Sequence, residues 1–387
     1  MRIYLDYNAT TPPARTVIDA IAETLREEIG NPSSVHAFGQ RAKAVLDRAR
    51  SATAALLDAE GSEIVFTSGG TEADNLALRG GFEAAKVHGR HRIVTTGLEH
   101  EAVLNTARAL TGQGAELVVV PAQTNGVVDA EAVAAAVTDQ TAIVSVMLAN
   151  NEIGTVQPVA ELGRICKDRG ALLHTDAVQA AGKIPISVKT LAVDLLSISA
   201  HKFAGPKGVG ALWIRRGVRL AAQATGGRQE RNRRAGTENV PGIVGLGVAA
   251  DLARTGLAKS AAVASLRDRL ESGILNAVPG TVVNGQGAPR VPNTTNISFE
   301  GIEAESLLIA LDLEGVAVST GSACSSGTLE PSHVLRAMGL PHARARNSLR
   351  FSLGGSTTAA EVDFVVGVLP GLVTKLRRLG RTAEALR

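Results

Sequence analysis

The chain has 387 residues, of which 45% are hydrophobic and 20% charged, a composition typical of a globular protein with a sizeable core. The length is enough for two domains, and a net charge of +3 is too small to indicate a polyanion partner by itself. Two cysteines argue against a disulfide framework and fit a reducing cytosol, so we expect a cytoplasmic protein. The first residues hold no apolar run, and nowhere do eighteen apolar residues follow one another, so we expect no signal peptide and no membrane span.

The predicted elements begin with an extended arm over residues 4–11, which Pro12-Pro13 closes. Two helical patterns follow, over about residues 17–29 and 45–56. Short apolar strands then alternate with amphipathic helices, a pattern that indicates an α/β fold with a mostly parallel sheet covered on both faces. The expected strands are Ile64–Thr67, Arg92–Thr96, Leu117–Val120, Ile143–Leu148, Leu172–Asp176, Asp194–Ser199 and Gly210–Ile214.

A long Ala-rich helical region begins after Pro241-Gly242, and the pattern changes again near Pro279. A smaller α+β domain is expected there, with a strand at Asn296–Phe299, a helix at Glu305–Leu311 and a strand at Val316–Ser319. We place the boundary near residue 255. A large α/β domain then covers residues 15–255, and residues 1–14 and 256–387 form the small domain, onto which the N-terminal arm packs back.

Polar residues follow the run Leu195–Ser199 where a strand should end, namely His201 and Lys202, and Gly205-Pro206 stops any regular continuation. Ligands of open α/β sheets bind at the ends of strands. A lysine delivered there suits covalent chemistry, because desolvation lowers the pKa of its amine. Taken alone, Ser-x-His-Lys is more often a surface lysine in a turn.

Two other turns carry polar groups at predicted strand ends. Residues 67–72, with Gly69 and Gly70, join a strand to a helix, where backbone N–H groups favour an anion. The segment lacks the lysine of a nucleotide P-loop. Asp176 and Gln179 follow another strand, and Asp176 alone reads as a helix cap. Beside a strand-end lysine, however, an Asp suits a pyridinium nitrogen, which a carboxylate keeps protonated.

In this order the three motifs resemble the pyridoxal-phosphate enzymes of aminotransferase class V. Further stretches resemble one branch of that family, the cysteine desulfurases of the NifS/IscS type. They are Tyr4–Pro12, Gly30–Ser34, Ala149–Thr155, Arg234–Asn239, Gly321–Cys324 and Glu330–Arg336. The resemblance covers nearly the whole chain. It implies the type I fold of pyridoxal-phosphate transferases and a homodimer.

The resemblance also implies roles for the matching residues. Lys202 would hold pyridoxal 5'-phosphate covalently, and His100 would stack on its ring and move a proton. Arg350 would bind the substrate carboxylate through its two-pronged guanidinium. The remaining contacts would come from Asp176 (ring nitrogen), Gln179 (ring hydroxyl), Asn151 (cofactor or substrate), Gly70, Thr71, Ser199 and His201 (phosphate) and Thr237 of the partner subunit. From the residues alone, Arg350 reads as a surface charge and His100 as a helix cap.

Cys324 separates this branch from the rest of the class. It stands among Gly and Ser residues with little to pack, so we expect an exposed, mobile loop. Even at its ordinary pKa a cysteine is a few per cent thiolate at pH 7 and strongly nucleophilic. Cys166 shares a helical face with Leu162 and Ile165 and is interpreted as packing. The resemblance implies that Cys324 takes sulfur from L-cysteine as a persulfide, leaving L-alanine. The sulfur would pass to an iron–sulfur scaffold protein or to thiolation. No metal site is expected.

Other functions stay open. A selenocysteine lyase or another class V transaminase would share the cofactor. A sulfur-relay scaffold would need only Cys324. A nucleic-acid-binding protein would use the basic segment 228–234, but Glu230 and Glu238 dilute its charge and no aromatic residues interleave, which favours a subunit-interface loop.

Two positions depart from the family pattern. Gly355-Ser356 stand where relatives commonly carry a basic and an aromatic residue, and Ala204 replaces a larger side chain. Packing near Arg350 is therefore expected to differ.

Overall fold

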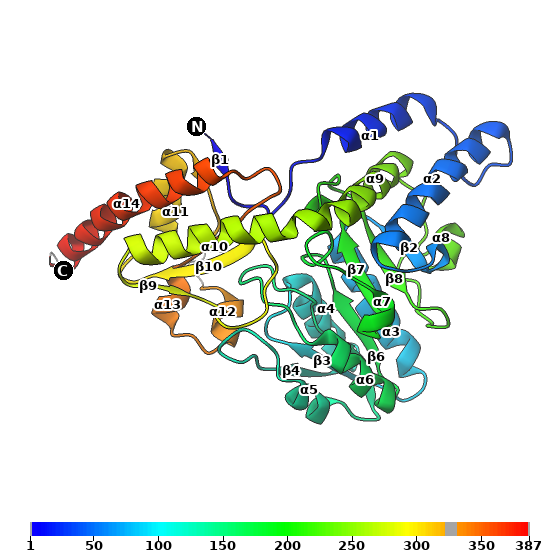
Figure 1. Ribbon diagram of the computed structural model, residues 1–387. Helices are drawn as coiled ribbons and strands as arrows, with labels where there is room; N and C mark the ends of the chain where they lie inside the picture. The colour runs from blue at the N-terminus through cyan, green and yellow to red at the C-terminus, as the bar shows by residue number, and fades with distance from the viewer. Residues whose placement is uncertain (1, 322–330, 386–387) are drawn as a thin grey trace.

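A computed structural model describes residues 2–321 and 331–385, and it separates into a larger and a smaller body of secondary structure (Figure 1). The larger body contains a seven-stranded sheet in the order β2-β8-β7-β6-β5-β3-β4. Its strands are β2 (Ile64–Thr67), β3 (Arg92–Thr96), β4 (Glu116–Val120), β5 (Thr141–Ser145), β6 (Leu172–Asp176), β7 (Leu195–Ser199) and β8 (Gly210–Ile214). β8 runs antiparallel to both β2 and β7, and the other pairs are parallel, so the predicted mostly parallel sheet is confirmed.

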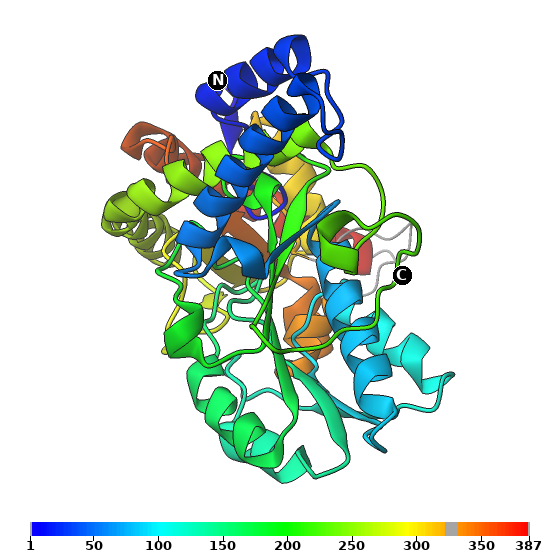
Figure 2. The ribbon, with the colours of Figure 1, turned by 90° about the vertical axis from the view of Figure 1, so that its right-hand side faces the viewer.

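Both faces of this sheet are covered by helices, as the view in Figure 2 shows edge-on. The helices are α1 (Arg15–Glu27), α2 (Ala37–Leu56), α3 (Gly70–Lys86), α4 (Glu101–Thr111), α5 (Ala130–Ala136), α6 (Val159–Arg169), α7 (Val188–Leu191), α8 (Gln229–Asn232) and α9 (Val240–Gly256). Because side chains alternate along a strand, Leu195 packs into the cluster under α3 and α4, while Leu196 and Ile198 pack into the opposite cluster. This two-sided burial explains the near-continuous apolar strands in the sequence.

The smaller body is built on an antiparallel sheet in the order β12-β10-β9, with its own buried core. Its strands are β9 (Thr281–Val283), β10 (Thr294–Phe299) and β12 (Ser348–Ser352), and its helices are α10 (Ser260–Ala277), α11 (Ala304–Leu313), α12 (His333–Ala337), α13 (His342–Arg346) and α14 (Ala359–Ala385). The predicted helix and the strand at 296–299 fall within α11 and β10. The sequence had not indicated β9 or β12.

The N-terminal arm joins the two bodies. Its strand β1 (Ile3–Tyr4) pairs in parallel with β11 (Val316–Ala317), and Asp6 bridges to Ser352 of β12. A few residues later, the Thr11 backbone N–H donates to the carbonyl oxygen of His201 at 2.8 Å, beside the end of β7. The arm thus packs on the smaller body, as expected, and then reaches the edge of the large sheet.

Helices α9 and α10 form one long helical segment, Val240–Ala277, which runs from one body to the other (Figure 1). Among the described residues it alone is long and apolar enough to cross a membrane, but half of its apolar window is buried inside the protein. Packing of α9 against α1 and α2 accounts for that apolar composition.

Candidate active site

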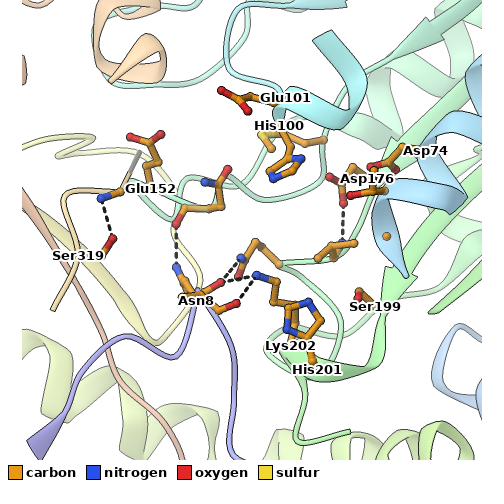
Figure 3. Close-up of a pocket in the computed structure, with 18 of the residues that line it drawn as sticks. Asn8, Asp74, His100, Glu101, Glu152, Asp176, Ser199, His201, Lys202 and Ser319 are labelled. Atoms are coloured by element: carbon orange, nitrogen blue, oxygen red, sulfur yellow. Dashed lines mark hydrogen bonds between the residues drawn. The ribbon is translucent and has the colours of Figure 1, made fainter. Parts of the chain in front are cut away.

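A cavity of about 410 Å³ opens at the ends of β6 and β7, where the arm and the smaller body meet the large sheet (Figure 3). Ten of the twelve predicted site residues line it: Gly70, Thr71, His100, Asn151, Asp176, Gln179, Ser199, His201, Lys202 and Arg350. Thr237 is exposed and is not among the lining residues, and Cys324 lies outside the described residues. Six separate segments of the chain therefore converge on one cavity.

Lys202 extends into this cavity from the short 3₁₀ turn Ala200–Lys202 that ends β7. Its Nζ donates to the backbone carbonyl oxygens of Asn8 and Ala9, at 2.7 and 2.8 Å. Burial, and next the positive charge of Arg350, lower the pKa of Lys202 to about 8. A lysine with this pKa carries a sizeable neutral, nucleophilic fraction near neutral pH.

Asp176 ends β6 and is only 5% exposed. Its Oδ1 accepts from the backbone N–H of Val178 at 2.8 Å, but the residues that follow form a turn and the next helix begins only at Val188, so the helix-cap interpretation of Asp176 was wrong. The bond occupies one carboxylate oxygen, and the residue still lines the cavity. Burial raises the pKa of Asp176, while the nearby His100 and Lys202 oppose that rise. A positively charged ligand atom at this point would hold the carboxylate ionised.

His100 caps the N-terminus of α4, because its Nδ1 accepts from the backbone N–H of Ala102 at 3.1 Å. The helix-cap interpretation is therefore confirmed. The same hydrogen bond fixes the neutral tautomer, since a ring whose Nδ1 accepts must carry its proton on Nε2. The ring also lines the cavity opposite Lys202 (Figure 3), so capping and a role in the site are compatible.

An anion-binding corner is formed at the N-terminus of α3. The first N–H groups of a helix lack partners within it and carry a partial positive charge. Gly70 is required here, because a Cβ at this position would come within 2.8 Å of Val178 Cγ2. Ser199 and His201 face the same corner. Burial, with the charges of Lys202 and Lys207, lowers the pKa of His201 to about 4, so its ring is neutral.

Arg350 lies on β12 and is only 4% exposed, so its interpretation as a surface charge was wrong. The reason is long-range: pairing with β10 sets Arg350 opposite Asn296 in the interior. One guanidinium nitrogen forms an ion pair with Asp6 at 2.6 Å, and another donates to the Asn151 carbonyl oxygen at 3.0 Å. Its Nε, like Oδ1 of Asn151, is buried without a partner among the described residues. Such atoms indicate a missing ligand.

Asn8 forms hydrogen bonds with several residues of the site, although the sequence analysis assigned it no role beyond its place in a motif. Its amide Nδ2 donates to the carbonyl oxygen of Asn151 at 3.0 Å, and its backbone oxygen accepts from Lys202 and Gln179. Its Oδ1 accepts from Lys183 at 2.8 Å. Asn8 was missed because an extended arm carries no periodic signal, and these bonds exist only after the arm has docked.

A buried polar cluster lies beneath Asp176. His174 forms short contacts with the hydroxyls of Ser145 and Ser197, and its Nε2 is 3.5 Å from Asp74 Oδ1. Burial lowers the pKa of His174 to about 3, so the imidazole is neutral and the contact is no ion pair. Burial and the charge of Asp176 raise the pKa of Asp74 well above its usual value. Both causes favour the protonated form of Asp74.

The basic segment 228–234 is tied to the rest of the chain by ion pairs. Glu230 receives two bonds from Arg50, at 2.7 and 2.8 Å, and one from the backbone N–H of Phe66 at 3.0 Å. Arg234 pairs with Glu72 in the first turn of α3, at 2.8 Å. This segment is thereby fixed beside the anion-binding corner.

Comparisons with known proteins agree with this geometry. The family model described as "Aminotransferase class-V" matches residues 3–365. A protein of Nostoc sp. named "Cysteine desulfurase" is 51% identical over 381 residues, which cover 97% of this chain and 94% of that one. The solved structure of a "NIFS-like protein" superposes with a TM-score of 0.91 at 39% identity, covering 97% of this chain and all of that chain. Another, named "SspA in complex with cysteine", gives a TM-score of 0.81 at 33% identity over 91% and 99% of the two chains.

Proposed function

The chain belongs to the class-V aminotransferase family, and from that premise we propose that it is a pyridoxal-phosphate-dependent cysteine desulfurase converting L-cysteine to L-alanine. One observation carries the proposal. Lys202, Asp176 and Arg350, which come from segments far apart in the chain, line the same cavity. The relatives named cysteine desulfurase, and the relative whose structure is named as a cysteine complex, support the choice of substrate.

The residues of the cavity fit the cofactor of this family. The anion-binding corner at α3 suits a phosphate, and Lys202 presents an amine with a lowered pKa. Asp176 suits a protonated ring nitrogen, and Gln179 suits a ring hydroxyl. Oδ1 of Asn151 is buried without a hydrogen-bond partner among the described residues, so it could also bind a polar group of the cofactor. When bound, pyridoxal phosphate supplies an electron sink next to the substrate's α-carbon.

The chain's own residues would do the rest. Lys202, once neutral, takes the proton from the substrate's α-carbon. His100 carries its proton on Nε2 and so can donate it within the cavity. A cationic partner would favour the ionised form of Asp176, and burial favours the protonated form of Asp74, which would reduce the repulsion between the two carboxyl groups.

Arg350 would bind the substrate carboxylate. Its Nε has no partner among the described residues and its terminal nitrogens donate to Asp6 and the Asn151 carbonyl, so its orientation is set before substrate arrives. A carboxylate bound there would place the amino acid between Lys202 and His100. Pre-oriented charged donors of this kind give up little entropy on binding.

Sulfur transfer would fall to Cys324. In the net reaction the C–S bond of L-cysteine breaks and a new S–S bond forms to Cys324 Sγ. The carbon gains a proton and two electrons to become the methyl group of alanine, while the sulfur remains on Cys324 as a persulfide. A protein acceptor, such as an iron–sulfur scaffold, would then take the sulfur.

The wider setting is also part of the proposal. It includes the two domains expected at residues 15–255 and at residues 1–14 with 256–387; a buried core drawn from residues 3–5 and 270–373 supports them, although Val334, Leu335 and Ala345 pack into the core of the larger body. A cytoplasmic homodimer would bring Thr237 of the partner subunit to the phosphate, consistent with its exposure away from this chain's own cavity. The ion pairs that fix segment 228–234 support an interface loop over a nucleic-acid surface.

The deciding experiment compares Cys324→Ser with Cys166→Ser. Serine keeps the size of the residue but is not a thiolate at neutral pH. Cys324→Ser should bind the cofactor and still change its visible spectrum with L-cysteine, yet yield almost no alanine or sulfide. Cys166→Ser, at a buried site, should stay active. A transaminase would be indifferent to both changes, and a selenocysteine lyase would prefer selenocysteine in the same assay. Desulfuration by Cys324→Ser at a near wild-type rate would overturn the proposal.

A further inference from the structure

A second cavity, of about 340 Å³, lies behind Lys202. Among the described residues, Lys202 is the one residue that lines both cavities. Three small residues, Ala204, Gly355 and Ser356, all line the second cavity. Small residues at these points leave open space, since a Cβ added at Gly355 would meet no atom within 4 Å.

The charges around this second cavity are all of one sign. Its described lining includes Lys183, Lys202 and Lys259 but no Asp or Glu. Phe203, Val263 and Leu353 supply apolar walls. The remaining polar groups are neutral: Tyr7, Thr11, Ser260, Asn293 and Ser356. A one-sided positive potential in a low-dielectric recess attracts anions, and the apolar walls reward an apolar body.

Lys183 is the buried anchor of this arrangement. It is 8% exposed, and its Nζ donates to two neutral oxygens, Oδ1 of Asn8 and Oε1 of Gln179. No carboxylate forms an ion pair with it among the described residues. A buried ammonium without a counter-ion is costly, and a bound anion would relieve that cost. Burial and the charges of Lys202 and Arg350 accordingly hold the pKa of Lys183 well below its usual value.

We propose that this second cavity binds a small organic monocarboxylate with an apolar body. Its volume falls within the range of about 300–1,000 Å³ typical of small-molecule sites. The carboxylate is placed toward Lys183 and Lys259, and the apolar part against Phe203 and Val263. The site is separate from the substrate site, and binding of a carboxylate there does not depend on the reaction proposed above.

An occupant would act on the first cavity through short contacts. Lys183 bonds to Asn8 and Gln179, and Asn8 bonds to Lys202. Negative charge in the second cavity favours the protonated form of a nearby amine, so it raises the pKa of Lys202 above about 8. The ligand is therefore expected to slow any step that needs Lys202 neutral.

Titration calorimetry of the holoprotein tests the site, with phenylacetate as probe and phenylacetamide as its neutral match. Phenylacetate should bind at least tenfold more tightly than the amide. Gly355→Phe fills the cavity and should abolish binding. Gly371→Phe, at an exposed glycine of α14 with open space around it, should not change it. Lys259→Gln should weaken binding severalfold, while Lys167→Gln on α6 should not.

The substrate site is the competing location for a carboxylate, so Arg350→Gln is the discriminating variant. Binding that survives in Arg350→Gln and disappears in Gly355→Phe supports the second cavity. Binding that disappears in Arg350→Gln but survives in Gly355→Phe places the probe in the substrate site and overturns the proposal. Absence of binding to the wild type at 20 mM, about the weakest affinity worth detecting, also overturns it. If Gly355→Phe fails to fold, equal affinities of Lys259→Gln and wild type overturn it instead.

Discussion

The lowered pKa of Lys202 gives a prediction with a definite size. A pKa of about 8 in place of 10.5 leaves about a tenth of Lys202 neutral at pH 7. That fraction is roughly 300 times the neutral fraction of an ordinary lysine, equivalent to about 3 kcal/mol. Burial is the first cause and the charge of Arg350 the second, so the two can be separated by a variant.

The assay is competitive acetylation of the cofactor-free protein with acetic anhydride from pH 6 to 11, read by peptide mass spectrometry. Labelling of Lys202 should rise with a midpoint near pH 8. Exposed Lys207 in the same loop is the internal reference. In Arg350→Gln the midpoint should move upward, because a positive neighbour no longer disfavours the ammonium.

Two results would refute this reasoning. A wild-type midpoint at or above 10 would mean that burial does not perturb the amine. A downward movement in Arg350→Gln would mean that Arg350 affects Lys202 by some means other than its charge. If the reasoning holds, attachment of the proposed cofactor to Lys202 should slow about tenfold for each pH unit below 8, because the neutral fraction of the amine falls by that factor.

Three further predictions concern buried groups. Glu230→Ala leaves Arg50 buried without its partner, so the free energy of unfolding in urea should fall by about 3–5 kcal/mol, and a loss under about 1 kcal/mol contradicts the pairing. Burial raises the pKa of Glu99 from 4.5 to about 8, so between these two pH values the folded protein keeps a proton that the unfolded chain has lost. The free energy of unfolding therefore falls as the pH rises from 4.5 to about 8. Glu99→Gln should flatten that part of the Tm profile, and an unchanged slope would exclude Glu99 as its source. The Cys166 thiol, with a pKa raised to about 12 by burial, should resist iodoacetamide at pH 8 until the protein is unfolded; rapid labelling of native protein is the contrary result.

Most of the large sheet was predictable because its strands are locally distinct. Runs such as Ile64–Thr67 and Gly210–Ile214 are buried on both faces and bounded by turn residues. The apolar pattern and the flanking turn residues therefore predict the same strand. The antiparallel direction of β8 was not predictable, since a strand's sequence does not state its direction. β9 and β12 were missed for another reason: Thr281–Val283 is very short, and Ser348–Ser352 is interrupted by a buried arginine.

Some residues of the site were also predictable from the sequence, and others were not. Lys202 and Asp176 follow apolar strands, so their place at a sheet edge can be argued from sequence pattern. The positions of Arg350 and Asn8 depend on partners far away in the sequence, so local sequence patterns could not predict them. Asp74 could have been found, because an acidic residue on the otherwise apolar face of an amphipathic helix is a recognisable anomaly.

The docking of the N-terminal arm has a consequence for the order of events during synthesis. Asn8 is among the first residues to leave the ribosome, and its backbone N–H donates to Oγ of Ser352, which is synthesised 344 residues later. Asp6 is separated from its partner Arg350 by the same 344 residues. Closing so long a loop is slow, and these contacts form only when almost the whole chain is available. The large sheet can therefore fold on the ribosome before the cavity is complete, and the cofactor proposed above would bind only after almost the whole chain has been made.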